Sequence, residues 1–563
     1  MSMDRVPRAI FAASTLLYVI TGGYLTAGRG YLMGDALSRV SATESALFSR
    51  DPHLSAIGFV FTPLTALAQL PFVALGRWVP AITRWGLSGV VMTALFMAGA
   101  VVMVWGIGRD RGVPVWLCAL VTAVFALNPM VVFYGGNGMS EALFLFCLCW
   151  AVRRLMRWVT TDGVHDLVAC GIALGLGYLT RYDALAPAAT AGVFVFALSY
   201  YRRRSAQYRF SGAAMDLVLV AAPVALAFVV WAGTSWLITG QGFQQFTSQY
   251  GNSAILAQEG ASAPHHPLAA AQYSIGAMLI LAPALPLLLP IAGALAIRRR
   301  ELTPLVPMLL CGSVLGFQML SYASGSTFAF LRFYVAVIPL TAILALTIAP
   351  ARGVVPSRRL GAFASAEERG TPDPATPPRR AARGRVTGAV GATLAGLLLV
   401  VSLPVTARGM NSQLMAVQEY ALRAVLFPDP EDTSDKYLDA EHIAYTFAAE
   451  RRLADHIDAM NLPRDSIVMD TVYGFAVQIA SKHPDRFVIP SDRDFVHTLN
   501  HPLERGVKYI LSVPNSGRGT SDAVNRRYPT MYENGAQIAT LELEIPNDGA
   551  GQPDWRLYRV IGS

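Results

Sequence analysis

The sequence is poor in charge and in cysteine. Only 15% of its 563 residues are charged and 53% are hydrophobic, whereas about a quarter of the residues of a soluble domain are charged. This balance excludes an ordinary soluble protein and indicates a polytopic membrane protein. The formal net charge is +8, but nearly all basic residues are arginines in short clusters between apolar runs, and no basic stripe is interleaved with aromatics. The chain is therefore not expected to bind nucleic acid.

The five cysteines exclude two classes of site. All of them lie in or beside apolar runs and none lies in the polar C-terminal third, so no disulfide framework is predicted. Cys147 and Cys149 do not have a metal-ligand spacing. The first apolar run, 10–27, follows Arg5 and Arg8 as a signal peptide would, but it lacks a convincing cleavage site. We therefore expect an uncleaved first span.

Long apolar runs predict many membrane crossings of about 20 residues each. The arginine clusters 153–157, 202–204, 298–300 and 352–385 should face the cytoplasm, which places the C-terminal region outside it. An even number of crossings that starts from a cytoplasmic N-terminus would leave the C-terminal region in the cytoplasm. We expect 11 crossings, with 13 as the alternative, because the runs within 108–152 are short and broken. The candidate spans are 9–27, 55–76, 87–107, 114–133, 139–157, 164–181, 183–200, 212–238, 271–297, 303–322, 331–350 and 386–405.

The pattern divides the chain into a polytopic α-helical membrane domain, 1–405, a connector, 406–440, and a C-terminal soluble α/β domain, 441–563. The stretch 351–385 is rich in Pro, Arg and small residues and is expected to be a disordered cytoplasmic loop. The C-terminal domain should lie outside the cytoplasm as a module that caps or binds. Its predicted helices are 441–460 and 473–481, and its predicted strands are 466–470, 486–489, 507–513, 541–545 and 555–560, the last two forming a hairpin.

The stretch 31–71 carries the most informative carboxylate. Asp35 follows the first span directly, and a carboxylate beside a membrane span is costly and points to function. It can serve as a general base, or it can cap the helix that begins at the next residue. That helix should lie on the membrane surface, with Arg39 and Glu44 on its solvated face. His53, in the following loop, is a candidate proton shuttle or acceptor contact.

The order of these features resembles the GT-C glycosyltransferases, which include protein O-mannosyltransferases, aminoarabinose transferases and mycobacterial arabinofuranosyltransferases. A first span, a loop opening with Asp35, surface helices and a proline-containing second span come first. LNPMVVFYGGNGMSEALF (127–144) and GLGYLTRYDALAPAA (175–189) are similar to two further family segments. The resemblance implies a polyprenyl-phosphate-linked sugar donor and Asp35 as the first-loop catalytic carboxylate. Many members have two acidic residues there, whereas Gly34 and Ala36 flank Asp35. This single carboxylate does not support a divalent metal in the loop, and we expect no cofactor.

Further polar residues at predicted outer boundaries are candidates for substrate binding. Glu141 lies where a second family carboxylate often falls, or it caps the helix that follows. Arg181 can bind a phosphodiester, or it can pair with Asp183 to anchor a turn. Arg332, among aromatic residues, can hold the donor phosphate or extend toward the lipid headgroups. Tyr250, in the long polar loop 239–267, suits sugar hydroxyls.

The sequence thus predicts a multi-pass enzyme of a bacterial plasma membrane that transfers a hexosyl or pentosyl group outside the cytoplasm. Its partners would be a polyprenyl-phosphate-linked sugar, a glycan, lipid or protein acceptor, and the membrane lipids. The alternatives are a lipid or glycan transporter or flippase, and a non-enzymatic envelope assembly protein. No inverted repeat and no pair of charged, glycine-broken segments favours the transporter.

Overall fold

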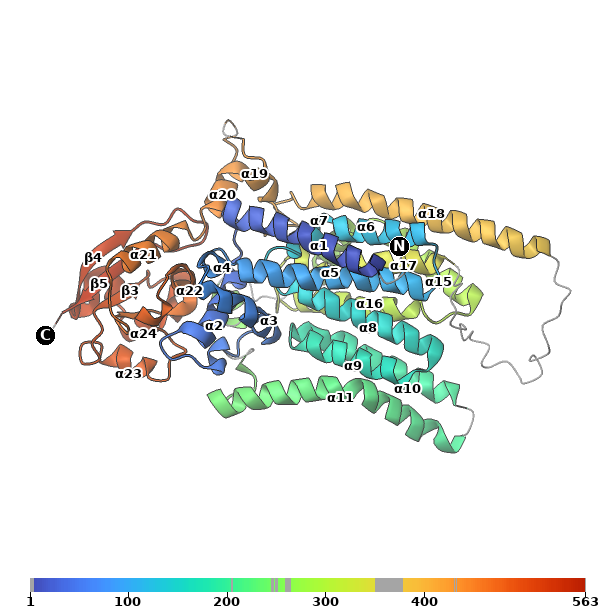
Figure 1. Cartoon of the computed structure of the whole chain (residues 1–563), viewed down its shortest axis with the longest axis horizontal. Helices are drawn as coiled ribbons and strands as arrows, with labels where there is room; N and C mark the ends of the chain where they lie inside the picture. Colours follow the sequence, from blue (N-terminus) through green and yellow to red (C-terminus); the bar gives the residue numbers. More distant parts are fainter. Residues whose placement is uncertain are drawn as a thin grey trace.

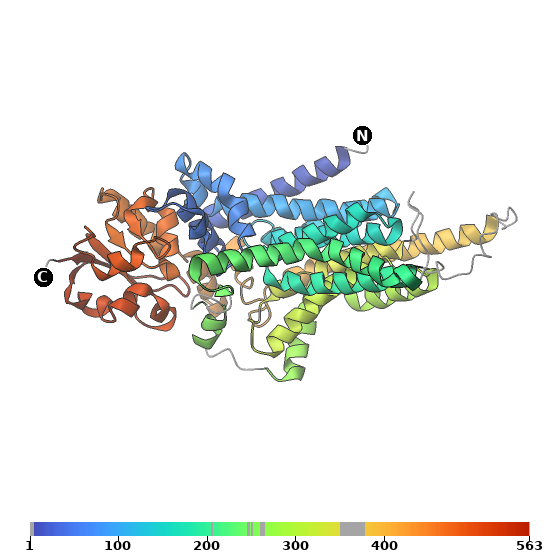
Figure 2. The same cartoon turned by 90° about the horizontal axis from the view of Figure 1, so that it is seen from below.

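The structure, a computed structural model, describes residues 5–203, 206–244, 248, 252–258, 265–349, 378–429, 431 and 433–561. Long helices lie side by side along the longest axis, and the C-terminal domain lies at one end of them (Figure 1). The view from below shows the same division (Figure 2). The expected architecture of a helical membrane domain followed by a small sheet domain is confirmed.

Within the described ranges, six helices are long and apolar enough to cross a membrane, and a seventh span is possible if α14 and α15, bent by 85°, count as one. Several other predicted spans form shorter apolar helices, so the number of crossings remains a prediction. The long membrane-domain helices are α1 (Arg5–Gly23) with its π-helical end η1 (Tyr24–Gly28), α5 (Leu87–Asp110), α8 (Glu141–Thr161), α9 (Val164–Tyr178), α10 (Leu185–Arg202), α11 (Ala206–Thr239), α14 (Pro267–Leu281), α15 (Leu285–Arg299), α16 (Leu305–Ala323), α17 (Val337–Ile348) and α18 (Pro378–Gly409).

The segment 108–152, where a broken run was expected, contains α6 (Val115–Leu127) and α7 (Pro129–Tyr134) ahead of α8. The break between α6 and α7 has a local cause, because Asn128 caps α7 by accepting a hydrogen bond from the Met130 amide at 3.1 Å. At about 1.5 Å per residue, α6 is too short to cross a bilayer by itself.

The predicted loop 351–385 lies mostly outside the described residues, but its last part differs from the expectation. Residues 378–385 are the first turns of α18 rather than an irregular loop. The proline that begins α18 suits the first position of a helix, where a backbone N–H has no helical partner.

The stretch after the first span folds into short helices between the membrane helices and the C-terminal domain (Figure 1). They are α2 (Gly34–Phe48), η2 (Leu54–Ile57), α3 (Leu64–Val73), η3 (Ala74–Arg77) and α4 (Ala81–Arg84). The helix expected from Ala36 begins earlier, at Gly34, and its N-cap is Met33. Asp35 therefore lies inside the first turn and does not cap the helix, which corrects one of the two readings of this residue.

The prediction that Arg39 and Glu44 lie on a solvated face of α2 is wrong. Arg39 and Glu44 are both buried. Arg39 packs against Met139 and the Phe61 ring, Glu44 interacts with Thr83, and the C-terminal domain packs on another side of the same helix through Ser41 and Ser45. Gln478 of the C-terminal domain is fully buried at the contact, accepts a hydrogen bond from Ser41 at 3.0 Å and donates one to Ser45 at 2.9 Å. The buried polar groups at this contact are therefore hydrogen-bonded to each other across the two domains.

The C-terminal domain is built on one five-stranded sheet in the order β2-β1-β3-β5-β4. The first three strands are parallel and the last two form the predicted antiparallel hairpin. The helix expected over 441–460 is instead two helices, because Phe447 between them adopts a left-handed conformation with φ of 64°. The elements are α20 (Asp435–Ala444), α21 (Ala448–Ala459), β1 (Ile467–Val468), α22 (Thr471–Ala480), β2 (Phe487–Val488), β3 (Tyr509–Ser512), β4 (Ala539–Ile545) and β5 (Trp555–Val560).

Candidate active site

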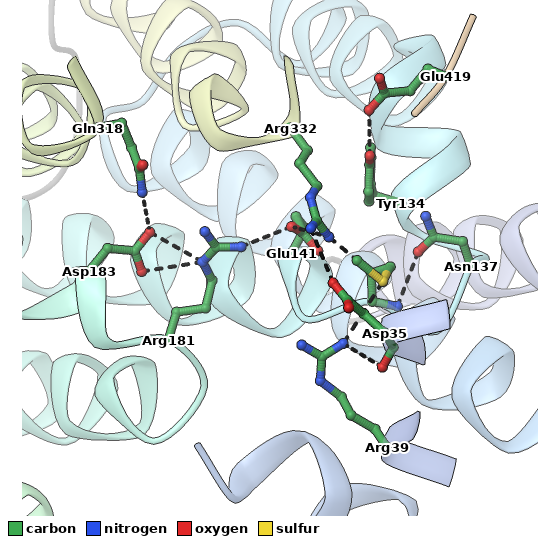
Figure 3. A network of polar contacts seen from close by, with 11 residues as sticks. Asp35, Arg39, Tyr134, Asn137, Glu141, Arg181, Asp183, Gln318, Arg332 and Glu419 are labelled. Carbon is green, nitrogen blue, oxygen red and sulfur yellow. Dashed lines mark hydrogen bonds and ion pairs between the residues drawn. The ribbon is translucent and has the colours of Figure 1, made fainter. Parts of the chain in front are cut away.

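Asp35, in the first turn of α2, and Arg332 meet in a network of polar contacts (Figure 3). Arg332 lies in a short 3-10 turn, η5 (Leu331–Tyr334), ahead of α17. Its Nη2 atom donates to Asp35 Oδ2 at 3.1 Å. The Asp35 side chain is 43% exposed, whereas that of Arg332 is 7% exposed. A reachable carboxylate is therefore held against a buried guanidinium group.

Glu141 lies behind this pair and links it to Arg181. The loop through Gly138 delivers Glu141 to the first turn of α8, where its side chain is 1% exposed. Its Oε1 atom lies 2.8 Å from Arg181 Nη1 and 3.5 Å from Arg332 Nη1. Of the two readings of Glu141, a cap and a group within the site, the contacts fit the second, because Ser140 is the N-cap.

Arg181 continues the row of alternating charges shown in Figure 3. Its Nε atom lies 3.2 Å from both carboxylate oxygens of Asp183, and Asp183 also accepts a hydrogen bond from Gln318 Nε2 at 2.8 Å. The Arg181–Asp183 pair anticipated from the sequence is thus present. Because Glu141 is shared with Arg332, the pair belongs to the network around Asp35 rather than to an isolated turn.

Aromatic rings enclose the guanidinium groups. Arg332 lies over the ring of Phe330 at 5.1 Å and over that of Phe333 at 5.3 Å. Arg181 also lies over Phe333, at 5.3 Å. A cation held between ring faces and carboxylates keeps its charge and its orientation away from water. The aromatic residues around Arg332, read from the sequence as a sign of binding or of lipid contact, form this enclosure.

Arg39 is a site residue that the sequence reasoning missed. Its Nη1 atom donates to the backbone oxygen of Asp35 at 2.9 Å, one helical turn away, and lies 3.8 Å from Met139 Sδ, which Arg332 also contacts at 3.8 Å. Its guanidinium group lies 4.8 Å from the centre of the Phe61 ring. The signal in the sequence was the one-turn spacing from Asp35, but a helix on a membrane surface would have turned Arg39 toward solvent.

The charges around Asp35 set its ionisation. Burial raises the pKa of the Asp35 carboxyl, but Arg332 and Arg39 outweigh burial and hold that pKa below its usual value. Arg518, from the C-terminal domain, acts in the same direction. Arg518 lies in η9 (Gly517–Ser521), which contacts α22, the helix that packs on α2. The carboxyl is therefore ionised and available at neutral pH.

Glu419 is a second residue that the sequence reasoning missed. It lies in the connector after α18, is fully buried, and accepts a hydrogen bond from the Tyr134 hydroxyl. Burial raises the pKa of its carboxyl to about 7, although the Tyr134 hydroxyl and Arg332 act in the opposite direction. The connector has neither helical nor strand periodicity, so nothing in the sequence marked this glutamate.

Two other predicted residues lie apart from this network. His53 contacts its own loop, with Nδ1 2.6 Å from the Asp51 carbonyl oxygen. Asp51 in turn pairs with Arg493 of the C-terminal domain at 3.6 Å. Tyr250 lies outside the described residues. In the part of the chain that the structure describes, no three His, Cys, Asp or Glu side chains are placed to hold a metal ion.

Comparison with known proteins establishes the fold. No protein-family model and no curated protein matches the chain. The crystal structure of ArnT from Cupriavidus metallidurans bound to undecaprenyl phosphate is similar with a TM-score of 0.54 and 14% identity, covering 99% of this chain and 98% of that chain. The archaeal oligosaccharyltransferase AglB from Archaeoglobus fulgidus, in complex with an inhibitory peptide and a dolichol-phosphate, gives a TM-score of 0.38 with 11% identity, covering 92% and 70%. The GT-C fold predicted from the order of the motifs is confirmed by the first likeness, which extends over the C-terminal domain.

Proposed function

We propose that the protein is an integral membrane glycosyltransferase that transfers a sugar from a polyprenyl-phosphate donor to an acceptor hydroxyl outside the cytoplasm. The observation that carries the proposal is the contact of 3.1 Å between the reachable Asp35 carboxylate and the buried Arg332 guanidinium. It supports the proposal because a carboxylate can act as a base and a guanidinium group can bind a phosphate. A protein of the same fold, ArnT, has been crystallised with undecaprenyl phosphate, which supports the class of donor.

The reaction needs one base and one cation. Asp35 takes the proton of the acceptor hydroxyl while the hydroxyl oxygen forms a bond to the anomeric carbon of the sugar. The bond between that carbon and the phosphate oxygen breaks, and its electron pair leaves with the polyprenyl phosphate. Arg332 neutralises the charge that develops on this leaving group. The products are the glycosylated acceptor and the polyprenyl monophosphate, with inversion at the anomeric carbon.

Arg332 cannot serve Asp35 and the phosphate with the same N–H group. When the donor phosphate takes the Nη2 group, Asp35 loses its nearest counter-charge and its pKa rises toward the ordinary value of a carboxyl. A carboxylate with a higher pKa is a stronger base. Loading the donor therefore activates the base, and Asp35 is restrained while the site holds no phosphate.

Arg181 and Arg39 have different roles in the proposed reaction. Arg181 faces two carboxylates, Asp183 and Glu141, so its role is to hold Glu141 and, through it, the orientation of Arg332. Arg39 donates to a backbone oxygen rather than to a carboxylate. Arg39 therefore keeps the capacity to bind a phosphate oxygen, and it replaces Arg181 as the second phosphate-binding residue.

The test is a donor panel assayed with the purified full-length protein in wild-type, Asp35→Ala and Asp35→Asn forms. We expect transfer from at least one polyprenyl-phosphoryl sugar, and a loss of about 10²–10⁴-fold in both variants. Asp162→Asn is the matched control, because Asp162 pairs with Arg202 away from this site and should leave the rate unchanged. If the wild-type protein consumes no polyprenyl-phosphoryl sugar, the proposal fails.

A further inference from the structure

Tyr134 and Glu419 come together beside the charged network although the connector that carries Glu419 follows the last membrane helix. Tyr134 ends α7 and is fully buried, and its hydroxyl donates to Glu419. The connector is held at two points by residues that directly follow the first span. Tyr31 donates to the backbone oxygen of Gln418 at 2.5 Å, and Arg29 Nε donates to that of Val425 at 2.8 Å. Glu419 is thus held in a fixed place next to the site.

Four side chains here carry a buried polar atom that has no hydrogen-bond partner among the residues the structure describes. These atoms are Oε2 of Glu419, Oε2 of Glu141, Nδ2 of Asn137 and Nε of Arg332. Each of the four residues is more than nine-tenths buried. Buried polar groups are rarely left unpaired, and several in one neighbourhood indicate that a ligand completes them. Figure 3 shows Tyr134, Glu419 and Asn137 beside the Glu141–Arg332 pair.

The four atoms select one chemical class. Glu419 and Glu141 offer acceptors, whereas Asn137 and Arg332 offer donors. A phosphate, which only accepts, is repelled by the two carboxylates, and a polyprenyl chain satisfies none of the four atoms. A sugar ring can satisfy all four atoms, because each of its hydroxyl groups both donates and accepts a hydrogen bond.

We propose that Glu419, Tyr134, Asn137 and Glu141 bind the sugar of the donor through its hydroxyl groups, on the Nε side of Arg332. This rests on the proposed function, because the sugar is joined to the phosphate that Arg332 holds. The phosphate lies toward Asp35 and Arg39, and the sugar lies toward Glu419. Glu419 is then a specificity-determining residue supplied by the connector.

The hydrogen bond with Tyr134 leaves one carboxylate oxygen of Glu419 available to a ligand. The hydrogen bond from Tyr134 occupies Oε1 of Glu419 and turns Oε2 away from it. A glutamine would keep the shape and the contact with Tyr134, but it would place an NH₂ donor where the sugar finds an acceptor. Glu419→Gln therefore tests sugar recognition with little change in packing.

The experiment measures binding of two lipids to the purified full-length protein. The probes are undecaprenyl phosphate and the undecaprenyl-phosphoryl sugar that the wild type binds most tightly among the glucose, mannose and arabinose forms. For Glu419→Gln we expect affinity for the sugar-free lipid that is no weaker than that of the wild type, because a carboxylate that repels phosphate is removed, and at least a tenfold loss for the sugar-bearing lipid. Tyr134→Phe, which leaves the ring in place, should show the same selective loss. This variant provides the test if Glu419→Gln does not fold. Glu441→Gln, on the exposed surface of α20, is the control and should change neither affinity.

Three results would overturn the inference. If Glu419→Gln and Tyr134→Phe keep the wild-type preference for the sugar-bearing lipid, the sugar is bound elsewhere. If both lipids lose affinity equally, Glu419 only fastens the connector. If the wild-type protein binds neither lipid, the proposed function fails and this inference fails with it.

Discussion

Arg332 donates to Asp35 from a position 297 residues further along the chain. The contact joins the loop after the first span to the turn before α17, and the C-terminal domain packs on α2, the helix that carries Asp35. Under the proposed function, the donor phosphate therefore competes with the Asp35 carboxylate for one buried guanidinium group.

This competition can be measured directly. Asp35→Asn removes the negative charge that faces Arg332, so undecaprenyl phosphate should bind several-fold more tightly than to the wild type. Arg332→Ala should weaken the same binding at least tenfold, and Arg332→Lys should recover only part of it, because an ammonium group lacks the planar fork of donors. Calorimetric or fluorescence titration of the lipid checks all three variants. Weaker binding to Asp35→Asn than to the wild type would contradict the competition.

The pH dependence of transfer should report the ionisation of Asp35 in two states. In the free protein Arg332 and Arg39 outweigh burial and lower the pKa of Asp35. The active form is the carboxylate, so kcat/KM should fall only as the pH drops below the usual range of an aspartate. With the donor phosphate on Arg332 that pKa rises, and the acid limb of kcat should lie at higher pH than that of kcat/KM. Coincident acid limbs would show that the phosphate does not displace Asp35.

Glu44 should make the folded state sensitive to alkali. Burial raises the pKa of its carboxyl to about 8, although Thr83 acts in the opposite direction. A carboxyl whose pKa is raised on folding contributes stability that is complete below its unfolded pKa and is lost as the pH rises through its folded pKa. Glu44→Gln should therefore be more stable than the wild type at pH 9, by about 2–4 kcal/mol, and similar to it at pH 5. Thermal unfolding in detergent at the two pH values measures this, and an equal difference at both would contradict it.

Docking of the C-terminal domain on α2 should be required to position Asp35. Gln478 is fully buried between Ser41 and Ser45, and Gln478→Leu leaves both hydroxyl groups without their partner, at a cost of about 1–3 kcal/mol. We expect slower transfer and faster proteolysis between the two domains, with undecaprenyl phosphate binding retained. Arg84→Ala removes an exposed ion pair with Asp455 at the same interface and should have little effect. If the two substitutions had equal effects, the exposed ion pair would contribute as much to docking of the C-terminal domain as the buried Gln478 does, which would contradict this prediction.

The fold could be predicted because its evidence is local. An acidic residue after a span, a proline-broken second span and the segments 127–144 and 175–189 each lie within a few turns, and their order is enough to indicate the GT-C fold. Asp35, Glu141, Arg181, Asp183 and Arg332 were selected one by one from such segments, and the structure brings all five into one network.

Arg39 and Glu419 could not be predicted because their roles depend on distant contacts. Arg39 is buried because Met139, a hundred residues further along the chain, and the Phe61 ring pack against its guanidinium group. Glu419 lies in a connector without periodicity, and only folding places it on Tyr134. Hydrophobic patterns describe which face of an element is buried, but they do not say which other element buries it.

The central claim is that Asp35 is the base in a transfer from a polyprenyl-phosphate donor. The most direct measurement is single-turnover transfer from a bound polyprenyl-phosphoryl sugar by the wild type and by Asp35→Asn, at donor concentrations that saturate both. The account predicts that the variant binds the donor at least as tightly as the wild type and transfers the sugar about 10²–10⁴-fold more slowly. An Asp35→Asn protein that transfers the bound sugar at the wild-type rate would contradict it.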